Sequence, residues 1–264
     1  MEVIIQSTPA AAAELLVRLI ARDLRANPQL VLGLATGRTM ERVYDRLAQM
    51  HRECGLSFAG ARTFNLDEYV GLPATDPHSY HRYMQEHLFR HVNVDLRNTH
   101  LPQGDASDLA AECHRYENLI RKCGGIDLQL LGIGQTGHIG FNEPLSALHS
   151  RTRVKALSPV TIAQNSSLFA DPSKMPRRAI TMGVGTILEA RRVLLLATGA
   201  GKAEIVAKAV EGPITSMISA SALQMHAHCT VIVDEAAAAK LQGQDYYRWI
   251  FANEPEWEPY RSAS

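Results

Sequence analysis

The fold of this chain is organised around residues 131–144, which have the sequence Leu131-Gly132-Ile133-Gly134-Gln135-Thr136-Gly137-His138-Ile139-Gly140-Phe141-Asn142-Glu143-Pro144. They follow an apolar run, residues 126–130, that predicts a buried strand. The glycines allow the backbone to turn and a ligand to approach main-chain N–H groups. Ligands bind beyond the carboxyl ends of strands in an open parallel sheet, so His138 and Glu143 are candidate catalytic residues. The alternative is an ordinary strand–loop turn with a solvated histidine.

Outside this segment, apolar strand-like runs alternate with helical patterns. The expected strands are residues 3–5, 30–34, 61–66, 126–130, 178–182, 192–197 and 229–233. The first helix shows the clearest start, with Thr8 as N-cap and Pro9 in the first helical position. Such alternation predicts one α/β domain over residues 1–264, with a mostly parallel sheet covered by helices on both faces.

The composition argues against binding to nucleic acid or to a membrane surface. Lys and Arg together number 27, as do Asp and Glu, so the formal net charge is zero. The four cysteines form no C-x-x-C pair, which argues against zinc or a redox dithiol and favours a reducing, cytoplasmic setting. We expect neither a signal peptide nor a membrane helix, because no suitable apolar run is present.

Two strand ends carry a glycine-containing loop with a cation. Thr36-Gly37-Arg38-Thr39 follows the second expected strand and leads into a helical pattern. Strand, glycine loop and helix direct backbone N–H groups and the helix dipole at an anion, although a plain turn explains this stretch equally well. Lys202 stands at an expected helix start, where the dipole disfavours a cation. An anion-binding role is therefore attractive for Lys202.

Acidic and histidine residues gather after the third expected strand. Asp67 and Glu68 form a carboxylate pair there, which is either functional or a pair of solvated loop charges. His87 and His91 have the i, i+4 spacing of metal ligands, but no glutamate-containing zinc motif accompanies them. We therefore expect these two histidines to be surface or packing residues.

A basic run and a polar segment follow the central glycine loop. Arg151, Arg153 and Lys155 alternate, so a strand would place them on one face, either as a solvated edge or as an anion site. Residues 156–177 are polar and weakly patterned, which predicts a lid over the site.

These separated motifs make the chain resemble the glucosamine-6-phosphate deaminase family. Gly-His-Ile-x-Phe-Asn-Glu-Pro at 137–144 and Asp-Glu-Tyr-Val-Gly-Leu at 67–72 are specific to it. The similarity runs in the family order over nearly the whole chain. The matching segments are residues 33–39, 63–73, 132–144, 150–155, 182–188, 198–202 and 211–212.

The resemblance implies a modified Rossmann-like, three-layer α/β/α sandwich and an enzyme of amino-sugar catabolism that needs neither metal nor cofactor. Its reaction would be isomerisation and deamination of glucosamine 6-phosphate to fructose 6-phosphate and ammonia. Asp67 matches the base that moves a proton from carbon 2 to carbon 1. His138 matches the acid–base group of ring opening, with Glu143 supporting it. The residues that match the phosphate site are Thr36, Gly37, Arg38, Thr39 and Lys202.

Two positions depart from the family pattern. Thr136 stands where the family usually has an aspartate of the acid–base group, so Glu143 would orient His138 alone. Ser167 stands where the family lid usually supplies an arginine to the phosphate. We expect Arg38, where the family commonly has a small residue, to replace that second cation.

The resemblance also implies assembly and regulation. Better-studied bacterial members are hexamers activated by N-acetylglucosamine 6-phosphate, so we expect a homo-oligomer. The positions that match the allosteric site are Ser146, Arg153 and Lys155.

Three other functions compete with this interpretation. A 6-phosphogluconolactonase shares the fold, but residues 67–69 and 141–144 argue against it. A galactosamine-6-phosphate deaminase is also relaxed at the position of Thr136. A non-catalytic sugar-phosphate sensor is the alternative from another class, and the presence of Asp67, His138 and Glu143 favours an enzyme over it.

Overall fold

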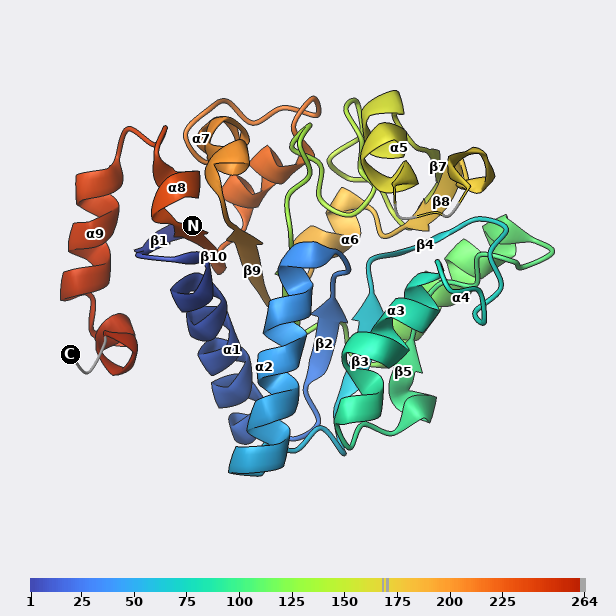
Figure 1. Ribbon diagram of the computed structural model, residues 1–264, viewed down its shortest axis with the longest axis horizontal. Helices are drawn as coiled ribbons and strands as arrows, with labels where there is room; N and C mark the ends of the chain where they lie inside the picture. The colour runs from blue at the N-terminus through green and yellow to red at the C-terminus, as the bar shows by residue number, and fades with distance from the viewer. Residues whose placement is uncertain (168, 170, 262–264) are drawn as a thin grey trace.

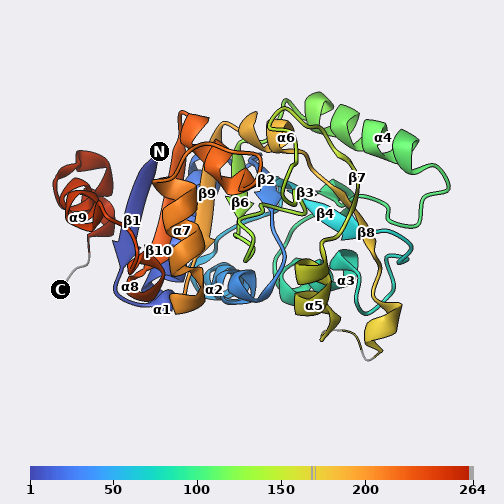
Figure 2. The same cartoon turned by 90° about the horizontal axis from the view of Figure 1, so that it is seen from above.

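The computed structural model describes residues 1–167, 169 and 171–261 (Figure 1). Within them, the core is a seven-stranded sheet whose pairings are all parallel. The strands lie in the order β1 (Glu2–Gln6), β10 (Cys229–Asp234), β9 (Arg192–Ala197), β6 (Leu128–Leu131), β2 (Val31–Leu34), β3 (Arg62–Asn65) and β5 (Thr99–His100). Helices cover both faces, so the predicted three-layer α/β/α sandwich is confirmed (Figure 2).

One face of the sheet carries α1 (Pro9–Ala26), α2 (Arg38–Cys54) and α3 (Tyr80–His87), whereas α4 (Leu109–Lys122) and α6 (Val184–Leu188) lie on the other (Figure 2). The other helices are α5 (Pro159–Ser166), α7 (Ala203–Val210), α8 (Glu235–Ala238) and α9 (Gln244–Asn253). The short 3₁₀ helices are η1 (Phe89–His91), η2 (Leu96–Asn98), η3 (Pro172–Lys174), η4 (Ala200–Lys202), η5 (Ser219–Met225) and η6 (Pro255–Tyr260).

Local sequence explains how these elements begin and why they pack. The Thr8 hydroxyl accepts a hydrogen bond from the Ala11 amide at 3.1 Å, which caps α1 as predicted. The central strands β9 and β10 are apolar almost throughout, because a parallel sheet covered on both faces has no solvated side. Helix α2 begins at Arg38, inside the stretch of residues 36–39 that was expected to lead into a helix.

A second, smaller sheet stands beside the carboxyl ends of the main strands. It pairs β4 (Asp67–Tyr69), β8 (Arg178–Thr181) and β7 (Arg153–Ala156) in antiparallel fashion. Sequence patterns predicted the end of a strand at Asp67 and missed β4. Apolar side chains form a separate cluster against this sheet, namely Tyr69, Phe141, Leu157, Phe169, Met175 and Ala179. Helix α5, inside the predicted lid, packs Ile162 against that cluster; residues 168 and 170 of the lid lie outside the described residues.

The C-terminal segment packs against the edge of the main sheet. Helix α9 contacts β1, and Trp257 in η6 is fully buried. Tyr246 and Trp249 on α9 remain exposed.

The described part of the chain contains neither a membrane-spanning helix nor a metal-binding group of side chains. None of its helices is both long and apolar enough to cross a membrane. Among the same residues, no group of three or more His, Cys, Asp or Glu side chains is placed to hold a metal ion. His87 instead packs on the ring of Tyr83, and His91 pairs with the backbone carbonyl of Glu86.

Candidate active site

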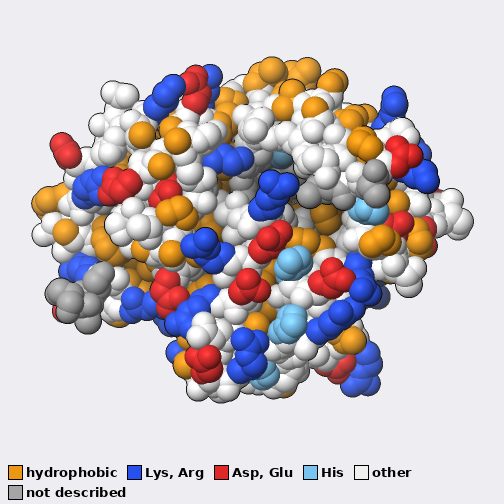
Figure 3. Space-filling view, in the orientation of Figure 1, with side chains coloured by type: hydrophobic (Ala, Val, Ile, Leu, Met, Phe, Trp, Pro, Cys, Tyr) orange, Lys and Arg blue, Asp and Glu red, His pale blue; other side chains and the backbone are white. Residues whose placement is uncertain are grey.

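Four neighbouring strands end at one edge of the sheet and carry the predicted catalytic and phosphate residues. Strands β9, β6, β2 and β3 are adjacent and parallel, so their carboxyl ends share that edge. They lead to Lys202, residues 132–144, residues 36–39 and Asp67 respectively. Figure 3 shows a hollow at this edge between the α5 and α7 sides, with Lys or Arg side chains and a histidine beside it.

His138, Thr136 and Glu143 form one hydrogen-bonded group in the loop after β6. The Thr136 hydroxyl lies 2.8 Å from Nδ1 of His138 and 3.5 Å from Oε2 of Glu143. The same Nδ1 lies 3.3 Å from Oε2 of Glu143. The expectation that Glu143 orients His138 alone is therefore wrong, because the threonine hydroxyl is the nearer partner of the ring. Only Glu143 supplies negative charge to this group.

Glycine is required at two positions around the histidine. A Cβ atom on Gly134 would stand 2.1 Å from Nε2 of His138, so a side chain there would displace the ring. Gly140 has φ +57°, and a Cβ atom on it would lie 2.9 Å from Oγ1 of Thr181 and 3.4 Å from Oδ2 of Asp67. Gly140 thus lets the histidine loop approach Asp67 closely.

Glu143 is buried, and its carboxylate accepts hydrogen bonds from several surrounding donors. Its Oε1 accepts bonds from the Ser158 amide at 3.1 Å and from the Thr161 hydroxyl at 2.5 Å. Burial acts to raise the pKa of Glu143, but hydrogen bonds from His138, Thr161 and Ser158 outweigh it and lower the pKa to about 2. Glu143 is therefore a fixed negative charge at neutral pH.

Asp67 has the opposite environment. Its side chain is buried on β4, and none of the described residues donates a hydrogen bond to its carboxylate. Burial, and then the negative charge of Glu68, raise the pKa of Asp67 to about 8. A carboxylate held in this way is a stronger base than an ordinary one.

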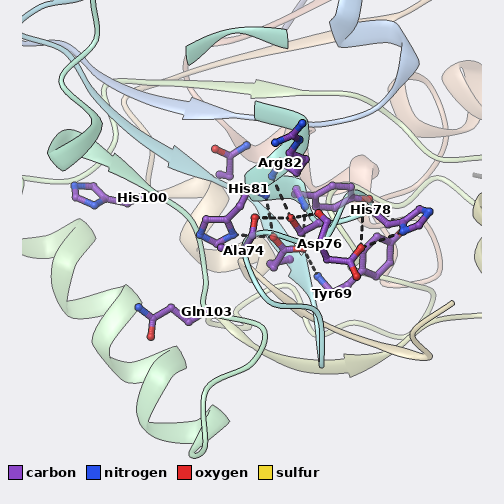
Figure 4. Close-up of polar contacts among 12 residues, drawn as sticks. Tyr69, Ala74, Asp76, His78, His81, Arg82, His100 and Gln103 are labelled. Atoms are coloured by element: carbon purple, nitrogen blue, oxygen red, sulfur yellow. Dashed lines mark hydrogen bonds and ion pairs between the residues drawn. The ribbon is translucent and has the colours of Figure 1, made fainter. Parts of the chain in front are cut away.

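Glu68, its neighbour in the sequence, is structural. Its Oε1 accepts bonds from the amides of Tyr69 and Tyr80, and its Oε2 accepts bonds from the amide and Nδ1 of His81. Figure 4 shows His81 on α3 turned toward this strand. The solvated alternative for the acidic pair is wrong, because both carboxylates are buried. They serve different purposes, since Glu68 caps α3 and Asp67 faces the site.

The predicted phosphate residues lie at the same edge of the sheet, residues 36–39 at the start of α2 and Lys202 in η4 after β9. Gly37 is the N-cap residue with φ +109°, and Arg38 is exposed and forms no ion pair with the described residues. Lys202 is half-buried, and its Nζ donates to the carbonyl of Ile133 at 2.7 Å. Burial lowers the pKa of Lys202. The helix start and two cations lie at the same sheet edge, which is a suitable arrangement for a phosphate.

The basic run after the loop divides into separate roles. Arg151 forms ion pairs with Glu117 and Glu189, so it does not belong to an anion site. Arg153 donates from Nη1 to Oδ1 of Asn142 at 2.9 Å, beside the catalytic loop.

The three positions expected to bind an effector are not equally accessible. Ser146 is buried and its hydroxyl forms no hydrogen bond with the described residues, while Arg153 and Lys155 on β7 are half-buried.

Helix α5 supplies a part of the site that the sequence patterns do not predict. Ser158 caps this helix by accepting from the Thr161 amide, and Pro159 occupies its first position. A serine followed by proline is a helix-start signal, so the helix itself was predictable. Its contact with Glu143 depends on the tertiary structure.

Comparison with known proteins agrees with this arrangement. Residues 6–232 match the family model described as glucosamine-6-phosphate isomerases/6-phosphogluconolactonase. The chain belongs to this family. The family has curated members named glucosamine-6-phosphate deaminase. The one from Hahella chejuensis is 51% identical over 250 residues, which cover 95% of each chain. The one from Streptomyces coelicolor is 48% identical and covers 98% of this chain and 99% of that protein.

Two solved structures resemble this chain to different degrees. A structure described as a monomeric glucosamine-6-phosphate deaminase matches with a TM-score of 0.89 and 44% identity, over 91% of this chain and all of that chain. The 6-phosphogluconolactonase of Trypanosoma cruzi matches with a TM-score of 0.73 and 22% identity, over 91% of this chain and 97% of that chain. The second match shows a shared fold alone.

Proposed function

We propose that this protein is a glucosamine-6-phosphate deaminase, which converts glucosamine 6-phosphate and water to fructose 6-phosphate and ammonia. The observation that carries the proposal is that Asp67, which is buried and accepts no hydrogen bond from the described residues, lies across Gly140 from the His138–Thr136–Glu143 group. Relatives of that name are 48–51% identical over nearly the full chain. The 6-phosphogluconolactonases share the family description, but the 6-phosphogluconolactonase of Trypanosoma cruzi is only 22% identical to this chain, whereas the structure described as a monomeric glucosamine-6-phosphate deaminase is 44% identical.

Ring opening is the step that we assign to His138. Opening a pyranose requires removal of the anomeric hydroxyl proton and delivery of a proton to the ring oxygen, and an imidazole performs both. Thr136 and Glu143 engage Nδ1, which leaves Nε2 for the sugar. The fixed charge of Glu143 stabilises the imidazolium that forms during the transfer.

Isomerisation is the step that we assign to Asp67. One carboxylate that reaches two adjacent carbons takes the proton from carbon 2 and returns it to carbon 1. With a pKa of about 8, Asp67 is largely protonated in the free protein at neutral pH. The ammonium group that the substrate carries on carbon 2 lowers this pKa on binding, because an opposite charge nearby favours the carboxylate. Substrate thereby generates the base that acts on it.

Phosphate binding is assigned to the loop between β2 and α2 together with Lys202. The amides at Gly37, Arg38 and Thr39 lie at the start of α2, and Thr36 precedes them. This chain has Ser167 where the family lid usually has an arginine, and Arg38 supplies the second cation in its place. Arg38→Ala should raise KM for the sugar phosphate about tenfold or more, because a charge-assisted hydrogen bond is lost. Arg42→Ala is the matched control on the same helix, and small equal effects of the two variants would contradict this role.

Ammonia release from the purified protein tests the function. Glucosamine 6-phosphate and galactosamine 6-phosphate are compared with a chelator present. We expect turnover of the glucosamine ester that the chelator leaves unchanged. Preference for the galactosamine ester would reassign the sugar. Absence of ammonia from both esters would refute deaminase activity and favour the sensor alternative.

Assembly and activation are further proposals. We propose a homo-oligomer, for which a hexamer is one candidate form, that responds to N-acetylglucosamine 6-phosphate through Ser146, Arg153 and Lys155. Arg153 bonds to Asn142 in the catalytic loop, which gives an effector there a direct route to the site. One solved relative is described as monomeric, so light scattering with and without the effector is the deciding measurement.

A further inference from the structure

We propose that Thr161 on α5 is a positioning residue for catalysis, because its hydroxyl holds Glu143 in the orientation that serves His138. This inference rests on the proposed function. Thr161 lies 23 positions after His138 in the sequence and belongs to a different structural element. Its relation to the histidine passes entirely through the carboxylate of Glu143.

The two oxygens of Glu143 have separate partners. Oε2 faces the His138 ring at 3.3 Å and the Thr136 hydroxyl at 3.5 Å. Oε1 faces the Thr161 hydroxyl at 2.5 Å and the Ser158 amide at 3.1 Å. The bonds from α5 to Oε1 therefore fix the plane of the carboxylate. This in turn determines where Oε2 lies relative to the His138 ring.

The Thr161 hydroxyl has a defined donor direction. An ionised carboxylate only accepts, so Thr161 must donate its proton to Glu143. The Ser158 hydroxyl donates to Oγ1 of Thr161 at 3.2 Å, and the Thr161 amide donates to the Ser158 hydroxyl, also at 3.2 Å. These bonds form a series that ends at Oε1 of Glu143. Such a series strengthens its last bond.

Burial shows that Thr161 is more than a surface residue of α5. The eight residues of α5 are all described, and Thr161 is the one that is buried, with 1% of its surface exposed. An amphipathic helix normally buries apolar side chains, and this one buries a hydroxyl bonded to a catalytic carboxylate. Apolar packing alone does not explain a threonine at this position.

Thr161→Val tests the inference because it removes the hydroxyl and keeps the shape. We expect kcat to fall on the order of tenfold, since a buried carboxylate loses a charge-assisted bond, while KM changes less than about twofold. The acid limb of the kcat profile should move to higher pH, because Glu143 is then protonated more easily. A purely structural role would lower the melting temperature without moving this limb.

Two further variants control the result. Thr161→Ser restores the hydroxyl and should recover most of kcat. Ser166→Ala removes a hydroxyl from the same helix that donates to the carbonyl of Ala163, with no bond to Glu143, and should leave kcat and the acid limb unchanged. Wild-type kinetics in Thr161→Val, or failure of Thr161→Ser to recover kcat, would overturn the inference.

A measurement independent of turnover separates this inference from the proposed function. NMR of the Glu143 side-chain carboxyl carbon, assigned with Glu143→Gln, follows its ionisation directly. In the wild type this carbon should not titrate above about pH 4, whereas in Thr161→Val it should titrate at higher pH. Identical titrations would refute the role of Thr161. A shifted titration in a protein that releases no ammonia would refute the proposed function alone.

Discussion

Asp67 and Glu143 are two carboxylates at one edge of the same sheet, and each has 5% of its surface exposed. Their pKa values nevertheless move in opposite directions, to about 8 for Asp67 and to about 2 for Glu143. Glu143 receives bonds from α5 and lies beside the His138 ring, whereas Asp67 receives none from the described residues. At Glu143 the hydrogen bonds outweigh the effect of burial on the pKa, whereas at Asp67 burial acts without such bonds from the described residues.

The difference suits the two proposed roles. A group that must take and return a proton benefits from a raised pKa, and a group that must stabilise an imidazolium benefits from a permanent charge. The antiparallel sheet supplies Asp67, and the glycine loop with α5 supplies and fixes Glu143.

Asp67→Asn should have the largest effect, a fall in kcat of about a thousandfold, because the only proposed base for carbon 2 is lost. The same substitution should lower activity but raise thermal stability at alkaline pH. The pKa of Asp67 is raised in the folded state, so its stabilising contribution is present below about pH 4 and is lost as the pH rises through about 8. The melting temperature of the variant, relative to that of the wild type, should increase as the pH is raised. A variant that is less stable than the wild type at about pH 9 would contradict the environment described for Asp67.

Glu143→Gln should lower kcat about a hundredfold, because the imidazolium loses its counter-charge. Here the pKa is lowered in the folded state, so the stabilising contribution is present above about pH 4.5 and is lost as the pH falls through about 2. The variant should therefore unfold at a lower temperature than the wild type at neutral pH, with the difference shrinking in acid. A uniform difference across the pH range would point to packing rather than charge.

Gly134→Ala should lower kcat by a few tens of fold, because its Cβ atom would occupy the place of Nε2 in His138. Gly132→Ala is the matched control in the same loop, where the nearest atom to a Cβ is the Met40 methyl at 4.0 Å. Steady-state kinetics of both variants measures the effect. Equal activity of the two would show that the His138 ring does not need this position.

Thr136→Val should have the smallest effect, a fall in kcat of less than about tenfold, because Glu143 remains beside the ring. Thr136→Asp restores the residue usual in the family and should be at least as active as the wild type. A valine variant with unchanged kcat would remove Thr136 from the catalytic group and leave Glu143 as the sole partner of His138.

Much of this fold is predictable because strands and helices of a parallel sheet follow local patterns. The strand at residues 192–197 and the Thr8 cap are found where periodicity and capping chemistry place them. The candidate residues at the strand ends meet because parallel strands end at one edge.

Other features depend on partners distant in the sequence. Strand β4 has three residues and pairs with β8 more than a hundred positions later, so no local periodicity reveals it. The capping role of Glu68 and the bond from Thr161 to Glu143 likewise exist only in the folded chain. The sequence identifies Asp67 and Glu143 as candidate carboxylates. Only their tertiary contacts show which of them has a raised pKa and which stays ionised.

Titration of the Asp67 and Glu143 carboxyl carbons by NMR in the free protein tests the division of roles most directly. The assignments come from Asp67→Asn and Glu143→Gln. The account predicts that Asp67 titrates near pH 8, while Glu143 is already ionised at the lowest pH at which the protein stays folded. Titration of Asp67 close to its ordinary value of 3.8, or of both groups together, would contradict it.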